Sequence, residues 1–276
     1  MVLDNKRIVF FVVFLIFGLM LGLGLRFLSG KLARPLPAPK PELMVTIPEG
    51  LTIREVENRL LAAGISGAVG LSSVQIETFK DSSAPIFYEF LKDAPGDVSL
   101  EGFLFPDTYR FWLDSSLETV VKKFLDNFDR KIFSEWRAEI KKQKKSMYEV
   151  IVMASLIENE VKLDKDRAIV SGILWKRLES GMKLDVDFTI CYIKALQNKR
   201  CLPITAEDKK IDSPYNTYIY KGLPPSPISN PGAAAIKAAI FPEENYYWYY
   251  LSKPDGETIF SRTLDEHNAA KKKYLK

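Results

Sequence analysis

Residues Ser213–Gly232 read SPYNTYIYKGLPPSPISNPG, with five prolines, two glycines, three tyrosines and two asparagines. Proline fixes φ and removes a backbone donor, so this composition excludes a regular helix or a central strand. The stretch predicts a long, stiff loop on the surface, whose tyrosines and asparagines could build a binding cleft. The alternative is a structural crossover whose tyrosines are satisfied within the fold, and composition alone leaves both interpretations open.

An apolar segment lies near the N-terminus. Ile8–Leu25 is an unbroken run of apolar residues and glycines, long enough to cross a bilayer as one helix. A cleaved signal peptide is the competing interpretation, but the run is followed by Arg26–Leu28 instead of a small-residue cleavage site. Positive charges flank the run on both sides. These charges therefore do not decide the orientation of the helix. Because a short tail needs no export, we expect residues 1–7 inside, a transmembrane helix at 8–28 and the large domain outside.

A spacer and a small folded unit follow the apolar segment. Alternating prolines in Ala33–Glu42 favour an extended polyproline II spacer, so residues 29–42 are predicted to be a Pro-rich linker. Met44–Pro48 then has a strand pattern. Thr52–Ala63 has a helical apolar face and is followed by Gly64, a typical helix stop. These signals predict a small βα module.

Capping patterns and periodicity predict the rest of the fold. The expected elements are a long helix opened by a capping box at Ser115 and Glu118 with an apolar stripe from Val121 to Trp136, a helix over Met147–Lys162 preceded by a capping box at Ser146 and Glu149, a helix over Asp164–Ser180, and a hairpin of Tyr246–Ser252 and Glu257–Arg262. The predicted fold class is α+β, rich in helices in the middle and with a β-hairpin near the C-terminus.

The composition narrows the possible chemistry. Net charge is +4 with acidic and basic residues mixed throughout, so no nucleic-acid partner is expected. The chain has one histidine, His267, which nearly excludes a histidine-ligated metal site. Cys191 and Cys201 could pair outside the membrane, but their spacing alone leaves this open. Any chemistry is therefore expected to rest on carboxylates, tyrosines or a lysine, with no metal and no cofactor.

The helix over Met147–Lys162 carries the candidate acid. Ala154–Val161 reads ASLIENEV, and its two glutamates, Glu158 and Glu160, point about 200° apart on a helix. Glu160 continues the apolar stripe that begins at Met153, and partial desolvation there would raise its pKa into the range of a general acid. Glu158 follows a smaller and more polar face. The alternative for Glu160 is an exposed glutamate at a frayed helix end.

Several motifs together resemble one family. They are ASLIENEV, GMKLDVDFTICY at Gly181–Tyr192, the block Ser213–Pro242, EGFLFPDTYRF at Glu101–Phe111 and LDEHN at Leu264–Asn268. In sequence and in order they are similar to the YceG-like (MltG) endolytic murein transglycosylases, from about Met44 to the C-terminus. The resemblance implies a LysM-like module and connection at residues 43–98 and a YceG-like catalytic domain of mixed α+β structure at residues 99–276.

The resemblance also implies an activity and a location. Such a protein is an endolytic lyase of the bacterial cytoplasmic (inner) membrane whose catalytic domain lies on the periplasmic or extracellular side. It cleaves nascent peptidoglycan strands between MurNAc and GlcNAc, leaves 1,6-anhydroMurNAc ends and thereby terminates strand elongation. The implied partners are peptidoglycan glycan strands, peptidoglycan synthases (penicillin-binding proteins) and the membrane. The family's catalytic glutamate is the second of an E-x-E pair, which falls on Glu160.

The same resemblance suggests substrate-binding residues. They are Tyr215, Asn216, Asp187, Thr189 and Glu158. The segment Leu184–Thr189 keeps the family's aspartate and threonine but lacks its glutamine and proline. Two other classes of protein remain as alternatives. One is a membrane-anchored, non-catalytic peptidoglycan-binding or scaffold protein. The other is a serine peptidase built on His267, which no nucleophile elbow accompanies.

Overall fold

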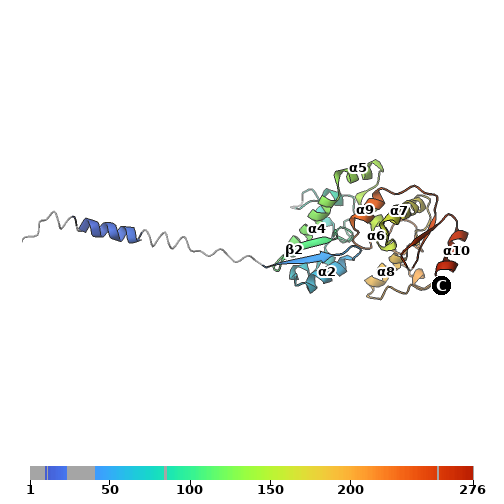
Figure 1. Cartoon of the computed structure of the whole chain (residues 1–276), viewed down its shortest axis with the longest axis horizontal. Helices are drawn as coiled ribbons and strands as arrows, with labels where there is room; N and C mark the ends of the chain where they lie inside the picture. Colours follow the sequence, from blue (N-terminus) through green and yellow to red (C-terminus); the bar gives the residue numbers. More distant parts are fainter. Residues whose placement is uncertain (1–9, 11, 24–40, 84–85, 254, 276) are drawn as a thin grey trace, which may run out of the picture. The chain divides into compact units, whose positions relative to one another are not determined.

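The computed structural model describes residues 10, 12–23, 41–83, 86–253 and 255–275, in two compact units, Met1–Lys40 and Pro41–Lys276 (Figure 1). In the first unit, residues 12–23 are helical with exposed side chains. None of the helices in the described part of the chain is both long and apolar enough to cross a membrane. The predicted tail, parts of the predicted span and most of the linker lie outside the described residues.

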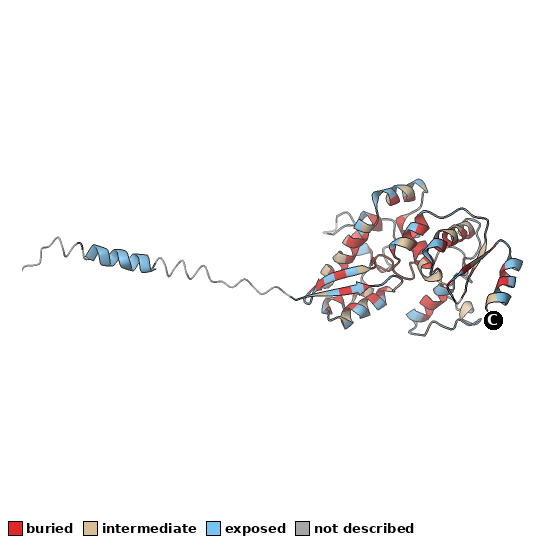
Figure 2. Cartoon of the chain, in the orientation of Figure 1, coloured by how far each residue is buried: buried red, intermediate tan, exposed pale blue. Residues whose placement is uncertain are grey.

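The second unit begins with a two-stranded sheet. β1 (Glu42–Ile47) pairs antiparallel with β2 (Asp107–Trp112), in a register that places Glu42 opposite Trp112 and Ile47 opposite Asp107. Alternate residues of both strands are buried, so one face of the sheet packs against the core (Figure 2). The strand predicted at Met44–Pro48 is confirmed. Its partner strand lies beyond the predicted boundary between residues 98 and 99.

Helix α2 (Ile53–Ala62) packs beside this sheet. Thr52 and Glu55 form a capping box at its start, and Ile53, Val56 and Leu60 are its buried residues. The predicted helix over residues 52–63 is therefore confirmed. Short elements connect α2 to β2, namely η1 (Ser66–Ala68), η2 (Leu71–Ser73), α3 (Glu77–Lys80) and η3 (Glu89–Leu91).

The prediction of one long helix ending near Trp136 is wrong in two respects. The structure has two helices, α4 (Leu117–Lys131) and α5 (Ser134–Lys142), because the backbone becomes extended between them, at Phe133. This break leaves Trp136 buried on the second helix. The cap is Ser116, whose hydroxyl accepts the Thr119 amide, whereas Ser115 is buried before the helix begins.

Helix α6 (Met147–Glu160) lies at the centre of the remaining helices. Its capping box at Ser146 and Glu149 is confirmed, and every residue from Val150 to Ile157 is buried. A helix that is apolar on all sides must be covered on all sides. Helices α7 (Asp164–Glu179), α8 (Asp187–Leu196) and α9 (Ala233–Ile240) all contact it (Figure 1). A disulfide joins Cys191 of α8 to Cys201, which decides the pairing that their spacing left open. The short helix η4 (Asp208–Lys210) follows.

The C-terminal part contains the predicted hairpin. β3 (Tyr249–Ser252) and β4 (Thr258–Ser261) pair antiparallel, with Tyr249 opposite Ser261, and α10 (Leu264–Tyr274) follows. The hairpin prediction is confirmed, and the mixed α+β class with it.

Residues Ser213–Gly232 form a loop without helix or strand, as predicted, but the loop does not lie wholly on the surface. Most of its second half is buried, and Asn230 is fully enclosed. The Asn230 side chain accepts the amides of Gly102 and Leu104, each at 2.9 Å, and donates to the Leu51 carbonyl at 2.9 Å. This half is the structural crossover that composition left open, and it ties the β1–α2 connection to the rest of the unit.

Candidate active site

Helix α6 ends at Glu160, because Val161 is extended and buried. Two other elements meet the Glu160 carboxyl group there. Oε2 accepts the hydroxyl of Tyr250, from β3, at 3.2 Å, and Oε1 accepts the backbone N–H of Phe188, from α8, at 3.4 Å. The Ser252 hydroxyl donates to the Glu160 carbonyl at 3.1 Å. A single carboxyl group is thus held between α6, α8 and β3.

The surroundings of Glu160 change its acidity. Burial, together with the nearby negative charge of Asp187, raises the pKa of Glu160 to about 7. The hydrogen bonds from Phe188 and Tyr250 act in the opposite direction and offset only part of this increase. A carboxyl group with such a pKa can donate a proton and take one back near neutral pH.

Asp187, the first residue of α8, lies beside Glu160 with a defined set of partners. Its carboxylate accepts the hydroxyl of Tyr218 at 2.5 Å and forms an ion pair with Nζ of Lys209 at 2.9 Å. The Lys209 ammonium also lies 4.2 Å from the centre of the Tyr218 ring. Burial and the hydrogen bond to Asp187 raise the pKa of Tyr218, so its hydroxyl stays protonated. The first half of the Ser213–Gly232 loop thus reaches the site through Tyr218.

These side chains line one pocket of about 590 Å³. Near Glu160 its walls are aromatic and polar, formed by Phe188, Tyr218 and Tyr250. The pocket continues to Arg177, Tyr249 and the sole histidine: the His267 ring stacks on Tyr249 with their centres 5.2 Å apart. Burial and the charges of Lys271 and Arg177 lower the pKa of His267, which favours the neutral imidazole at pH 7. The described residues include no group of three or more His, Cys, Asp or Glu side chains that could hold a metal ion.

Of the six residues predicted for the site, the structure brings Glu160 and Asp187 together in the pocket. Glu158 points elsewhere, as the helical spacing indicates. Both of its oxygens accept from the Arg167 guanidinium, at 3.0 and 3.2 Å, and one also accepts the Gly232 amide at 2.9 Å. Only 6% of the Glu158 side chain is exposed. As placed, Glu158 braces the loop against α6 instead of facing the pocket.

The other three predicted residues also lie outside the pocket lining. Thr189 is buried and donates to the Val186 carbonyl at 2.7 Å. Asn216 is buried and donates to the carbonyls of Lys209 and Ile211, which ties together the segments that carry Lys209 and Tyr218. The Tyr215 hydroxyl lies 2.6 Å from the Ser226 hydroxyl. Their predicted contact with substrate stays a prediction, while their contacts within the chain hold the loop in shape.

Three residues at the site were not predicted from the sequence: Tyr218, Tyr250 and Lys209. Tyr218 stands two and three residues from the predicted Asn216 and Tyr215, in the same tyrosine-rich block. Tyr250 is the second residue of a strand that was correctly predicted. Tyrosine richness of the loop and the hairpin was therefore the available signal, but it does not say which hydroxyl reaches the acid. The site is that of an α+β protein in which one carboxyl group with a raised pKa, suited to acid–base chemistry, lines a pocket.

Comparison with known proteins specifies this class further. The sequence profile of the YceG-like family matches residues 25–273, and the chain belongs to this family. It is 35% identical over 243 residues to the endolytic murein transglycosylase of Bacillus subtilis (strain 168). This match covers 84% of this chain and 65% of the Bacillus protein. It is 29% identical over 238 residues to the endolytic murein transglycosylase of Streptococcus pneumoniae (strain D39). This match covers 81% of this chain and 43% of the Streptococcus protein.

A solved structure supports the same assignment. The crystal structure of a YceG-like protein from Listeria monocytogenes matches with a TM-score of 0.69 and 32% sequence identity. The match covers 84% of this chain and 76% of the Listeria chain. The resemblance inferred from the sequence motifs is therefore confirmed at the level of the family. The chain spans less than two thirds of the length of the two curated relatives described above.

Proposed function

We propose that this chain is an endolytic lytic murein transglycosylase, which cleaves nascent peptidoglycan strands between MurNAc and GlcNAc and leaves 1,6-anhydroMurNAc ends. The observation that carries the proposal is the Glu160 carboxyl group, which lines a pocket and has a pKa of about 7. The similarity to the endolytic murein transglycosylases of Bacillus and Streptococcus supports the same activity.

The reaction needs one group that acts first as an acid and then as a base. Protonated Glu160 gives its proton to the glycosidic oxygen as the bond between that oxygen and C1 of MurNAc breaks. The resulting carboxylate then takes the proton from the O6 hydroxyl of the same MurNAc, and O6 bonds to C1 to close the anhydro ring. Glu160 ends protonated, no water is consumed, and no second carboxylate is required at the spacings that glycoside hydrolases use.

The neighbours of Glu160 have distinct roles in this proposal. Tyr250 orients one carboxyl oxygen, so that the other faces the reacting sugar. Asp187 places negative charge beside the site, which keeps Glu160 protonated at neutral pH and favours the positive charge that develops on the sugar. Lys209 and Tyr218 hold Asp187 in place.

The proposal includes a location and an organisation of domains. Residues 8–28 form a single membrane span, residues 29–42 are the linker, and the folded unit works on the outer side of the cytoplasmic membrane, beside penicillin-binding proteins that make the strands. The Cys191–Cys201 disulfide supports an oxidising compartment. Residues 43–98 are the LysM-like module with its connection, supported by the β1–α2 arrangement, and residues 99–276 are the catalytic domain.

The test is the chemistry of the new glycan ends. The full chain in detergent is incubated with uncrosslinked polymerised glycan, and mass spectrometry distinguishes anhydro ends from reducing ends, which are one water heavier. We expect anhydro ends, and a loss of about 10²–10⁴-fold in Glu160→Gln. Glu179→Gln is the matched control, because Glu179 also ends a helix but lies exposed outside the pocket, and this variant should keep full activity.

Two other outcomes would reassign the protein. Glycan that is bound but never cut would favour the non-catalytic binding or scaffold protein. Cleavage to ordinary reducing ends would indicate a hydrolase that activates water.

A further inference from the structure

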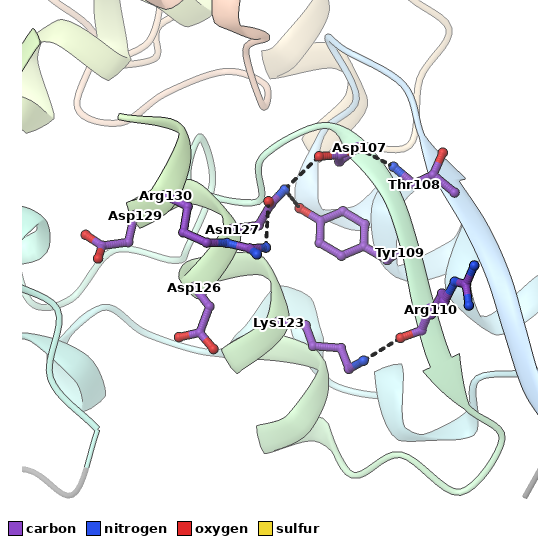
Figure 3. A pocket seen from close by; sticks show the side chains of 9 residues that line it. All are labelled: Asp107, Thr108, Tyr109, Arg110, Lys123, Asp126, Asn127, Asp129 and Arg130. Atoms are coloured by element: carbon purple, nitrogen blue, oxygen red, sulfur yellow. Dashed lines mark hydrogen bonds between the residues drawn. The ribbon is translucent and has the colours of Figure 1, made fainter. Parts of the chain in front are cut away.

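A second pocket, of about 540 Å³, lies between β2 and α4 and shares no lining residue with the pocket of Glu160 (Figure 3). Its lining is rich in charge. Arg110, Lys123 and Arg130 supply cations, and three aspartates, Asp107, Asp126 and Asp129, supply carboxylates. The mechanism proposed above uses none of these residues. What the pocket can bind depends on which of these charges are already paired.

The three aspartates are paired with cations outside the pocket. Asp107 forms an ion pair with Lys131 at 3.0 Å, Asp126 with Lys122 at 2.9 Å and Asp129 with Arg137 at 2.7 Å. None of these three cations lines the pocket. The charges of the aspartates are thus balanced by cations that do not line the pocket.

Two of the three cations of the pocket, Lys123 and Arg130, are not balanced in this way. Among the described residues, no carboxylate forms an ion pair with either of them, whereas Arg110 forms a long ion pair with Glu42, at 3.9 Å. Lys123 donates to the carbonyl of Arg110, which fixes its position but leaves its charge uncompensated (Figure 3). Once the external pairs are counted, the pocket therefore keeps a net positive charge.

The floor of the pocket orients one of these cations. Asn127 is 4% exposed, and its amide nitrogen donates to the Tyr109 hydroxyl at 2.9 Å and to Asp107 at 3.2 Å. Its amide oxygen is left to accept from the Arg130 guanidinium at 3.1 Å (Figure 3). Arg130 is otherwise exposed, so its remaining N–H groups can bind an anion. A planar guanidinium held by a buried amide suits bidentate binding of a carboxylate.

We propose that this β2–α4 pocket binds the stem peptide of peptidoglycan through its free carboxylates, with Arg130 and Lys123 as the principal contacts. The proposal rests on the proposed function, which supplies peptidoglycan as the substrate. The three aspartates favour a peptide over a polyanion. A stem peptide carries carboxylates, which Arg130 and Lys123 can bind, and also the ammonium of its diamino acid, which an aspartate can accept, whereas a phosphate polymer offers the aspartates no cation.

The test measures binding in the full chain carrying Glu160→Gln, so that it does not depend on cleavage. The probes are a GlcNAc–MurNAc disaccharide bearing a stem tripeptide, and the same disaccharide without the peptide, each titrated by calorimetry. We expect the peptide-bearing probe to bind more tightly, and Arg130→Gln or Lys123→Gln to weaken its binding by about tenfold each without changing that of the bare disaccharide. Lys122→Gln is the matched control on the same helix, because Lys122 pairs with Asp126 and does not line the pocket.

Three results would overturn the proposal. Equal affinity for the two probes would mean that the protein does not recognise the peptide. Unchanged binding in both Arg130→Gln and Lys123→Gln would mean that it is read elsewhere. Tighter binding of inorganic phosphate than of the peptide-bearing probe would assign the pocket to another anion. Absence of anhydro ends in the cleavage assay would instead contradict the proposed activity and leave this binding result standing.

Discussion

The charge of Asp187 should help to set the pH above which the proposed activity is lost. The first step of the proposed reaction requires protonated Glu160, whose pKa is about 7. The apparent kcat/KM should therefore be level below pH 7 and fall about tenfold per pH unit above it. Asp187→Asn removes a negative charge that helps to raise this pKa, so the decline should begin at lower pH.

The size of the change follows from the causes of the raised pKa. The pKa of Glu160 rises from 4.5 to about 7, an effect on the order of 3 kcal/mol, and burial is a larger cause of it than Asp187. We therefore expect Asp187→Asn to move the decline by about one pH unit, or ~1.4 kcal/mol. At pH 8 the activity of Asp187→Asn should then be about tenfold below that of the wild type. At pH 5 Glu160 is protonated in both proteins, so the lower pKa should not reduce activity there.

The assay is the rate of anhydro-end formation at limiting substrate, measured from pH 5 to pH 9. Lys209→Met supplies a control of opposite sign. It removes the cation paired with Asp187 at 2.9 Å and leaves the negative charge less compensated, so the decline should move to higher pH. A loss of activity in Asp187→Asn that is equal at every pH would refute the reasoning, because it would mean that Asp187 does not raise the pKa of Glu160.

Three further changes test other parts of the site and its support. Tyr250→Phe removes a hydrogen bond that lowers the pKa of Glu160, so the decline in kcat/KM should move to higher pH; no movement would contradict the contact. Arg167→Met should destabilise the fold by ~3–5 kcal/mol in urea unfolding, because it leaves Glu158 buried without its partner, and adding Glu158→Gln should recover part of the loss. Burial raises the pKa of Glu101 to about 8, against 4.5 in the unfolded chain, so the folded protein keeps a proton that the unfolded chain has lost between these values. Stability should then fall as pH rises from 5 to 8, and the melting temperature of Glu101→Gln should depend less on pH.

Local signals in the sequence predicted the elements well. A capping box involves only four consecutive residues, so it can be recognised in the sequence without knowledge of the fold. The start of α6 at Met147 therefore follows directly from Ser146 and Glu149. The break between α4 and α5 could not be read in this way. No glycine or proline marks it, and it arises where Phe133 turns the chain so that Trp136 can pack into the core. Tertiary packing overrides a continuous apolar stripe there.

The sequence predicted only the part of the site that lies on a single helix. The spacing of Glu158 and Glu160 showed that the two carboxylates face different surroundings, and periodicity assigned the apolar edge to Glu160. The hydroxyl that reaches Glu160 belongs to Tyr250, ninety residues further along the chain. Contacts of this kind are set by how the hairpin packs on α6, which no local pattern specifies. Composition left open whether the Ser213–Gly232 loop is a surface loop or a structural crossover for the same reason, and the structure encloses Asn230 in its second half.

The last turn of α6 combines two opposite electrostatic environments. The Glu158 side chain is buried against a guanidinium and a backbone amide, and it thereby connects the loop at Gly232 to the helix. Glu160 has no cation among the groups that hydrogen-bond to its carboxyl in the described structure, and has Asp187 nearby, so burial favours its neutral acid. The brace at Glu158 fixes the helix end that presents Glu160, so a rigid support and a protonated acid arise from residues two positions apart. An E-x-E pair on a helix can divide these tasks because a spacing of two residues places the two side chains on different faces.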